Sequence, residues 1–137
     1  MPKTRQKALN HCVFALSYHL VMATKYRNKV FTARMLVAFE AQARTRCEEW
    51  GGALVECNGE ADHVHLLIEL PPTVALADFV NALKPGTSRR LRKEFAEHVR
   101  TFYSKPVFWS RSYCVVSCGG APLSIIKQYV EQQKRPL

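Results

Sequence analysis

The residues best suited to chemistry include two histidines one position apart, His63 and His65, in the segment HVHLLIEL at 63–70. Side chains two residues apart on a β-strand share a face, so the two imidazoles face one way while the apolar residues between and after them enter a core. Neutral imidazoles bind divalent metal ions, and the neighbouring rings have the reach to hold one ion. Asp62 can orient an imidazole or join the metal site, although a turn residue is equally expected there. An H-x-H pattern alone also fits two half-exposed strand histidines.

A second candidate group lies in the segment IIKQYVEQQ at 125–133. Tyr129 and Gln133 are four residues apart and project from one face of a helix. A tyrosine hydroxyl is a competent nucleophile for phosphoryl transfer when a cation stabilises the charge that develops on the phosphate. The carbonyl oxygen of Gln133 suits a hard metal ion. Alternatively, Tyr129 packs against the preceding isoleucines and Gln133 is solvated.

The charge of the chain indicates the class of partner. Its 137 residues carry a formal net charge of +9, and an excess of Lys and Arg attracts polyphosphates through counterion release. Nucleic acid is therefore the favoured partner, although charge alone also fits a merely basic protein. The residues that we expect to contact DNA form two clusters, Lys25 and Arg27 in the first, and Lys84, Arg89, Arg90, Arg92 and Lys93 in the second.

Hydroxyl and aromatic residues near these cations extend the predicted DNA contacts. Thr87 and Ser88 lie beside the second cluster, where their hydroxyls are expected to add phosphate contacts. Tyr26 and Trp109 can stack on unpaired bases, although for Trp109 we favour a place in the core or as a cap over the fourth strand. A run of charges is also typical of a solvated helix face.

The apolar periodicity predicts the elements that position these residues. Strands are expected at 12–24, 53–57, 63–70 and 112–118, and helices at 32–50, 76–99 and 122–133. We expect a tight turn at Asn58-Gly59 and a break or kink in the second helix at Pro85-Gly86. The β-α-β-β-α-β order predicts an α+β fold of the ferredoxin-like or RRM-like type, with a four-stranded antiparallel sheet, helices on one face and an extra C-terminal helix that carries Tyr129.

Length and composition predict one domain over residues 1–137. The sequence has no apolar run long enough to span a bilayer and no apolar N-terminal stretch like that of a signal peptide, so we expect a soluble, cytoplasmic protein with no membrane partner. Its five cysteines include no C-x-x-C pair. They indicate neither a disulfide framework nor a thiolate zinc site.

Five ordered segments together carry a family resemblance: HLVMATKYR at 19–27, DHVHLLI at 62–68, LKPGTSRRLR at 83–92, FWSRSY at 108–113 and YVEQQ at 129–133. The chain resembles the small single-tyrosine HUH transposases of minimal insertion sequences. Members of that family move their elements as single strands that carry hairpins at their ends. The resemblance extends over nearly the whole chain, so it bears on fold and site together.

The resemblance implies roles for particular residues. His63 and His65 would bind a divalent metal, Mg²⁺ or Mn²⁺, Gln133 would complete the site, and Tyr129 would be the nucleophile. It also implies that single-stranded DNA is cut and rejoined through a 5′-phosphotyrosine, by a homodimer in which the tyrosine helix of one subunit completes the metal site of the other.

Three alternatives remain at this stage. One is a non-catalytic nucleic-acid-binding module with the same order of elements, although the K/R-G-F/Y type of motif that such modules use is absent from the sequence. Another is a host-domesticated relative that processes chromosomal hairpins. The third is a histidine-based metal hydrolase that activates a water molecule, which predicts that Tyr129→Phe remains active.

Overall fold

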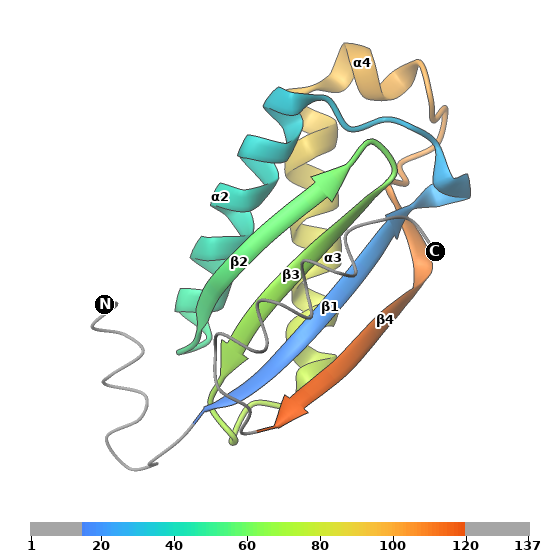
Figure 1. The fold of residues 1–137 in the computed structure, drawn as a ribbon. Helices are drawn as coiled ribbons and strands as arrows, with labels where there is room; N and C mark the ends of the chain where they lie inside the picture. Colours follow the sequence, from blue (N-terminus) through green and yellow to red (C-terminus); the bar gives the residue numbers. More distant parts are fainter. Residues whose placement is uncertain (1–14, 120–137) are drawn as a thin grey trace.

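The computed structural model describes residues 15–119, which form one antiparallel sheet with two helices packed on one of its faces (Figure 1). Along the chain the elements are β1 Leu16–Thr24, the 3₁₀ turn η1 Lys25–Arg27, α2 Ala33–Glu49, β2 Ala53–Glu60, β3 His63–Leu70, α3 Leu76–Glu94, α4 Ala96–Arg100 and β4 Trp109–Gly119. The four strands lie in the order β2-β3-β1-β4. The predicted α+β fold is confirmed. The helix predicted at 122–133 lies outside the described residues.

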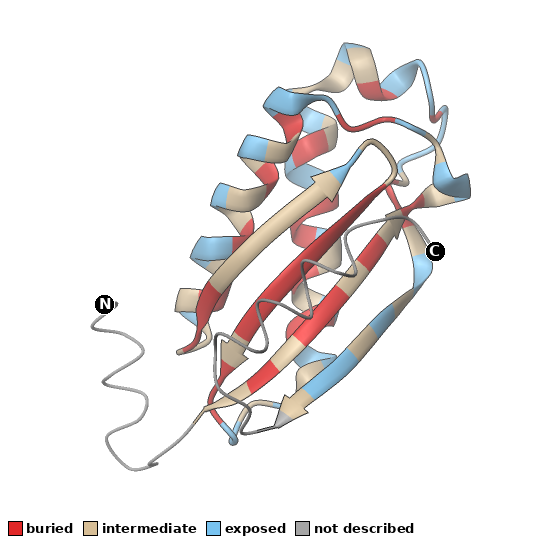
Figure 2. Ribbon diagram, in the orientation of Figure 1, coloured by how far each residue is buried: buried red, intermediate tan, exposed pale blue. Residues whose placement is uncertain are grey.

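The hydrophobic core lies between the sheet and the two long helices (Figure 2). Paired residues of neighbouring antiparallel strands share a face, and Leu20 of β1 lies opposite Leu66 of β3. Both are fully buried, as are Phe39 of α2 and Phe79 of α3. Full burial of such a side chain contributes about 1.5–3 kcal/mol. The face of β1 and β3 that carries these residues therefore holds the helices in place.

Helix α2 begins and ends as its sequence predicts. The Thr32 hydroxyl accepts a hydrogen bond from the backbone N–H of Met35 at 3.2 Å, which satisfies one of the donors left free at a helix start. Gly51 follows the last turn with a φ of 81°, a left-handed conformation that glycine adopts without steric cost. Thr32 and Gly51 thus fix the two ends of the helix.

Helix α3 passes through Pro85 without a break, so of the predicted break or kink at Pro85-Gly86 the break is wrong and the kink stays a prediction. A proline removes the hydrogen bond to the carbonyl four residues earlier. Here both Pro85 and Asn81 are exposed, so water can solvate the freed carbonyl. The helix ends instead before Phe95, whose φ of −117° and ψ of 41° leave the helical region. No helix within residues 15–119 combines the length and the apolar character needed to cross a bilayer.

The β2–β3 hairpin turns at Ala61 and Asp62, so the turn predicted at Asn58-Gly59 is wrong. Asn58 and Gly59 lie inside β2, opposite His65 and Val64 of β3. A Cβ atom at Gly59 would lie 2.6 Å from a methyl carbon of Leu36 in α2. The glycine is therefore required for close packing of the strand against the helix and not for a turn.

Candidate functional site

The two histidines of β3 lie on the face of the sheet away from α2 and α3. The alternation of β3 places Val64 and Leu66 in the core beneath the helices, so His63 and His65 face the other way. Their ring centroids are 4.9 Å apart. Only 3% of His63 and 4% of His65 is exposed, so the two rings are buried and not the half-exposed pair of the alternative interpretation.

Asp62 fixes the orientation of the His63 ring. The Nδ1 atom of His63 is 2.8 Å from Oδ1 of Asp62, and the other carboxylate oxygen lies 3.2 Å from a guanidinium nitrogen of Arg27. Burial alone would raise the pKa of the Asp62 carboxyl, but the hydrogen bond with His63 and the charge of Arg27 outweigh it and lower this pKa. An ionised carboxylate only accepts hydrogen bonds. His63 therefore carries its proton on Nδ1, which leaves the lone pair of Nε2 available as a ligand.

A third histidine, His19 of β1, contacts His65. Nε2 of His19 and Nδ1 of His65 are 3.0 Å apart and share a hydrogen bond. Burial lowers the pKa of His19, which favours the neutral imidazole. His19 was not among the predicted site residues, although the alternation in LSYHLVMAT directs its side chain to the face opposite that of the core residue Leu20. That alternation was the signal that could have found it.

The chemistry of the pair fits a metal ion. Nε2 of His63 is buried and has no hydrogen-bond partner among residues 15–119, and a buried polar atom without a partner is costly unless a ligand satisfies it. Across the same described residues, no cluster of three or more His, Cys, Asp or Glu side chains is placed to hold a metal. Two imidazoles alone make an incomplete site, so a third ligand has to come from another part of the chain or from the substrate. The predicted ligand Gln133 and the predicted nucleophile Tyr129 both lie outside the described residues.

The turn beside Asp62 has a strained backbone. Tyr26 and Arg27 adopt positive φ values of 62° and 55°, a conformation that costs a residue with a Cβ about 1–2 kcal/mol. The turn is held at Lys25, whose N–H donates to the Phe108 carbonyl at 2.9 Å and whose carbonyl accepts from the Tyr103 hydroxyl at 2.7 Å. It directs the Arg27 guanidinium to Asp62 and leaves the Tyr26 ring 78% exposed. Of the two predicted basic clusters, it is the first that lies beside the histidines.

Apart from Lys84, the second basic cluster lies on the opposite side of the sheet. Helix α3 packs on the face away from His63 and His65 (Figure 1), so the structure does not bring its cations to the histidines. Three members of the cluster are exposed, namely Arg89, Arg90 and Lys93. The Arg92 guanidinium donates to the Ser88 hydroxyl at 3.1 Å.

Lys84 joins helix α3 to strand β4. Its ammonium donates to the backbone carbonyls of Ser110 at 2.6 Å and Arg111 at 3.0 Å. Burial and the nearby charge of Lys25 lower the pKa of Lys84. Two of its three donors are therefore engaged within the fold, and the contact with DNA stays a prediction.

The structure buries Thr87, so its predicted phosphate contact is wrong, and it places Trp109 in the core, which the sequence favoured over stacking on bases. Thr87 is fully buried and Trp109 is 7% exposed. The indole N–H of Trp109 donates to the Thr87 hydroxyl at 3.0 Å, and that hydroxyl donates to the Leu83 carbonyl at 2.8 Å. Ser88 is also buried, at 9% exposure. Trp109 and Thr87 thus join β4 to α3, and the burial of Thr87 and Ser88 withdraws their hydroxyls from DNA.

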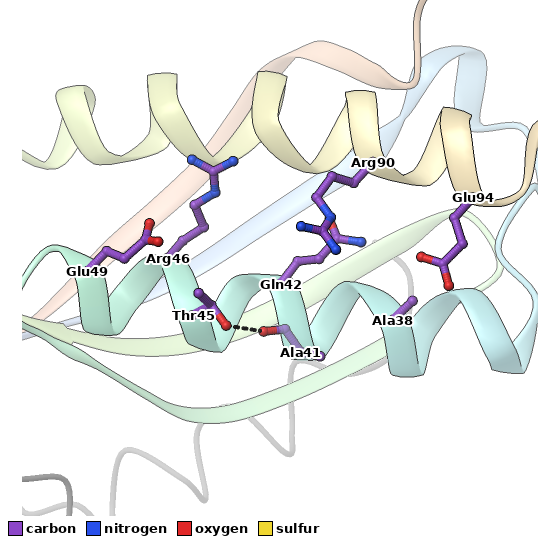
Figure 3. A pocket seen from close by; sticks show the side chains of 8 residues that line it. All are labelled: Ala38, Ala41, Gln42, Thr45, Arg46, Glu49, Arg90 and Glu94. Atoms are coloured by element: carbon purple, nitrogen blue, oxygen red, sulfur yellow. Dashed lines mark hydrogen bonds between the residues drawn. The ribbon is translucent and has the colours of Figure 1, made fainter.

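A polar groove of about 390 Å³ separates α2 from α3 (Figure 3). Arg46 extends into it from α2 and Arg90 from α3, with the Gln42 side chain close to Arg90. Both polar atoms of the Gln42 amide are buried without a hydrogen-bond partner among the described residues. The groove is lined by the helices alone, so it is separate from the histidine site across the sheet.

Comparisons with known proteins show the family to which this α+β domain with paired histidines belongs. The chain matches a sequence model described as "Transposase IS200 like" over residues 12–133. It is 32% identical over 132 residues to the transposase for insertion sequence element IS200 of Salmonella typhimurium, covering 94% of this chain and 86% of that protein. It is 29% identical over 121 residues to the ISDra2 transposase TnpA of Deinococcus radiodurans, covering 88% of this chain and 86% of the relative.

A solved structure supports the same relationship. A Deinococcus radiodurans protein whose crystal structure is described as that of a "putative transposase" superimposes with a TM-score of 0.70 and 32% identity, covering 90% of this chain and 94% of the other. The fold of this chain is thus similar to the fold of that protein. The chain belongs to the IS200-like transposase family, and it is a DNA-processing enzyme of insertion-sequence transposition.

Proposed function

We propose that this transposase cuts and rejoins single-stranded DNA at the ends of its insertion sequence through a covalent link to Tyr129. Mg²⁺ or Mn²⁺ would be held by His63, His65 and Gln133. The observation that carries the proposal is the pair of buried histidines whose Nδ1 atoms are both engaged, at 2.8 Å and 3.0 Å, by side chains of the protein. A protein contact on Nδ1 is typical of histidines that bind a metal through Nε2.

The donor set bears on the choice of ion. Mg²⁺ strongly prefers oxygen ligands, whereas imidazole suits transition metals better. A site with two imidazole nitrogens and one amide oxygen should accordingly favour Mn²⁺ over Mg²⁺ when both are present at equal concentration. When bound, the ion would polarise the scissile phosphate and stabilise the charge that develops on its oxygens.

The reaction conserves bonds from substrate to product. The Tyr129 hydroxyl attacks phosphorus in line and loses its proton, the bond from phosphorus to the 3′-oxygen breaks, and that oxygen leaves as a 3′-hydroxyl after it takes up a proton. A different 3′-hydroxyl then attacks the 5′-phosphotyrosine and releases the tyrosine. One phosphodiester-type bond replaces another, so no nucleotide cofactor is needed.

Other side chains would hold the DNA. Lys25 and Arg27 lie on the turn beside Asp62, where their charge favours the phosphates next to the scissile one. The exposed cations of α3, Arg89, Arg90 and Lys93, lie across the sheet and would contact another part of the substrate, such as the stem of a DNA hairpin. The enzyme would act as a homodimer with the tyrosine of one subunit completing the site of the other.

Cleavage of the element's own single-stranded ends tests the proposal. Purified protein is incubated with these oligonucleotides in Mn²⁺ or EDTA, beside Tyr129→Phe and His63→Ala, and separated on denaturing gels. We expect a protein–DNA adduct in wild type with Mn²⁺ that is absent from both variants and from EDTA.

Each other outcome would indicate a different function for this protein. Equal cleavage by wild type and Tyr129→Phe without an adduct would indicate a hydrolase that uses water. Hairpin binding without any cleavage would indicate a binding module. Activity on chromosomal hairpins in preference to the element's ends would indicate a domesticated relative.

A further inference from the structure

The third histidine, His19, has so far been described only as a side chain that contacts Nδ1 of His65. His19 lies on β1 opposite Leu67 of β3. His65 is two residues before Leu67 on the same face of the sheet, so it is a diagonal neighbour of His19. Diagonal neighbours on adjacent strands are within reach of ring side chains. Its own exposure is only 3%. A histidine buried beside the candidate ligands needs a physical account.

The geometry of the two rings shows how they interact. Their planes differ by 19° and their centroids are 5.2 Å apart, while Nε2 of His19 and Nδ1 of His65 are only 3.0 Å apart. A short nitrogen–nitrogen distance with this centroid separation fits nearly coplanar rings that meet edge to edge. A hydrogen bond in the ring plane is directed along the nitrogen lone pair, which is its favourable geometry.

The contact parallels the one made by the other histidine. Asp62 engages Nδ1 of His63 at 2.8 Å, and His19 engages the same atom of His65 at 3.0 Å. A ligand histidine must keep the lone pair of its metal-binding nitrogen, so the other ring nitrogen carries the proton and needs an acceptor. Nε2 of a neutral His19 protonated on Nδ1 is such an acceptor.

We propose that His19 is a positioning residue, which accepts the Nδ1 proton of His65 and so presents Nε2 of His65 to the metal. The inference rests on the proposed metal-dependent function and adds to it the residue that selects the tautomer of the second ligand. Two different groups, a carboxylate and an imidazole, then do the same task for the two histidines. Loss of such an outer partner typically weakens metal binding about 10- to 100-fold.

Three variants separate positioning from packing. His19→Phe keeps a buried ring but removes the acceptor, whereas His19→Gln removes the ring and supplies an amide oxygen near the original position of Nε2. Ser17→Ala is the matched control, because Ser17 is also buried on β1, on the same face of the sheet. Circular dichroism of each variant establishes that it is folded.

Binding of Mn²⁺ to the full chain without DNA is measured by the loss of the free-ion signal in electron paramagnetic resonance. We expect His19→Phe to weaken Mn²⁺ binding about 10- to 100-fold, His19→Gln to recover most of that loss, and Ser17→Ala to bind as wild type does. Binding by His19→Phe equal to that of wild type would overturn the proposal.

The tautomer of His65 gives a readout that needs no metal. Long-range proton–nitrogen NMR spectra of the metal-free protein distinguish Nδ1–H from Nε2–H in each imidazole. We expect Nδ1–H for His65 in wild type and loss of this preference in His19→Phe. An Nε2–H tautomer in wild type would refute the positioning role. If wild type binds no Mn²⁺, the proposed metal chemistry fails, and the tautomers still decide what His19 does.

Discussion

Substitutions at Tyr26 should separate a backbone cost from a binding contribution. Tyr26 has a φ of 62° and a ψ of 14°, and its ring is 78% exposed. A left-handed backbone costs a residue with a Cβ about 1–2 kcal/mol, and glycine avoids that cost but loses about 0.4–1 kcal/mol through a more flexible unfolded chain. Tyr26→Gly should therefore be about 1 kcal/mol more stable than Tyr26→Ala, because both lack the ring and only alanine keeps the strain.

The Tyr26 side chain should contribute to DNA binding and not to the stability of the fold. The Lys25 ammonium lies 5.5 Å from the Tyr26 ring centroid, a contact of about 0.5–1 kcal/mol at an exposed site that both variants lose. Stacking of one base on an aromatic side chain contributes about 1–3 kcal/mol. Both variants should thus bind single-stranded DNA roughly 5- to 150-fold more weakly than wild type, since about 1.4 kcal/mol is a factor of ten. Tyr26→Phe should bind as wild type does.

Two assays check these expectations. Urea unfolding followed by circular dichroism at one fixed protein concentration gives the free energy of unfolding for each variant, and fluorescence anisotropy with a labelled oligonucleotide at fixed salt gives the affinity. Equal stability of the glycine and alanine variants would refute the strain argument. Unchanged DNA affinity in both would refute the stacking argument and leave the exposed ring without a role in binding.

Three further predictions concern the fold and the helical face. Thr87→Val should lower the free energy of unfolding by about 1–3 kcal/mol in urea titrations, because the buried indole N–H of Trp109 loses its acceptor; a smaller loss would mean that the indole finds another partner. Burial raises the pKa of Cys47 to about 12, so iodoacetamide at neutral or mildly alkaline pH should label this thiol only after unfolding, as peptide mass mapping can show; rapid labelling of the native protein would contradict it. Arg90→Ala should reduce the slope of log affinity for hairpin DNA against log salt by about 0.9 if Arg90 contacts one phosphate, and an unchanged slope would argue against that contact.

Periodic patterns in the sequence predicted the fold well because they report on burial. Alternation in HVHLLIEL separated the core residues of β3 from its histidines, and apolar spacing located α2 to within a residue at each end. Two local signals failed, each for its own physical reason. Gly59 lies in a strand because Leu36 leaves no room for a Cβ. Helix α3 continues past Pro85, where Asn81 is exposed and water can solvate its freed carbonyl.

The spacing of His63 and His65 identified them as candidate ligands, but most of the contacts that orient their rings could not be predicted from the sequence. The Asp62–His63 contact joins sequence neighbours and was anticipated as one of two possibilities. By contrast, Arg27 reaches Asp62 only through a left-handed turn, and residues with positive φ other than glycine carry no clear sequence signal. The contact of His19 with His65 depends on the register of β1 against β3, and a pairing shifted by one residue would turn His19 to the other face.

The placement of the basic residues suggests how binding and chemistry divide between the two faces of the sheet. Lys25 and Arg27 share a rigid turn with the support of His63, so a phosphate bound there would be held in a fixed relation to the candidate metal ligands. Arg89 and Arg90 lie on α3, with the sheet between them and the histidines, and one phosphate cannot contact both groups. Charge removal on α3 should therefore weaken DNA binding without changing the pattern of cleavage products, whereas removal of the Arg27 guanidinium should slow cleavage of DNA that is already bound. If charge removal on α3 slowed cleavage of bound DNA and removal of the Arg27 guanidinium weakened only binding, the scissile strand would lie on the helical face.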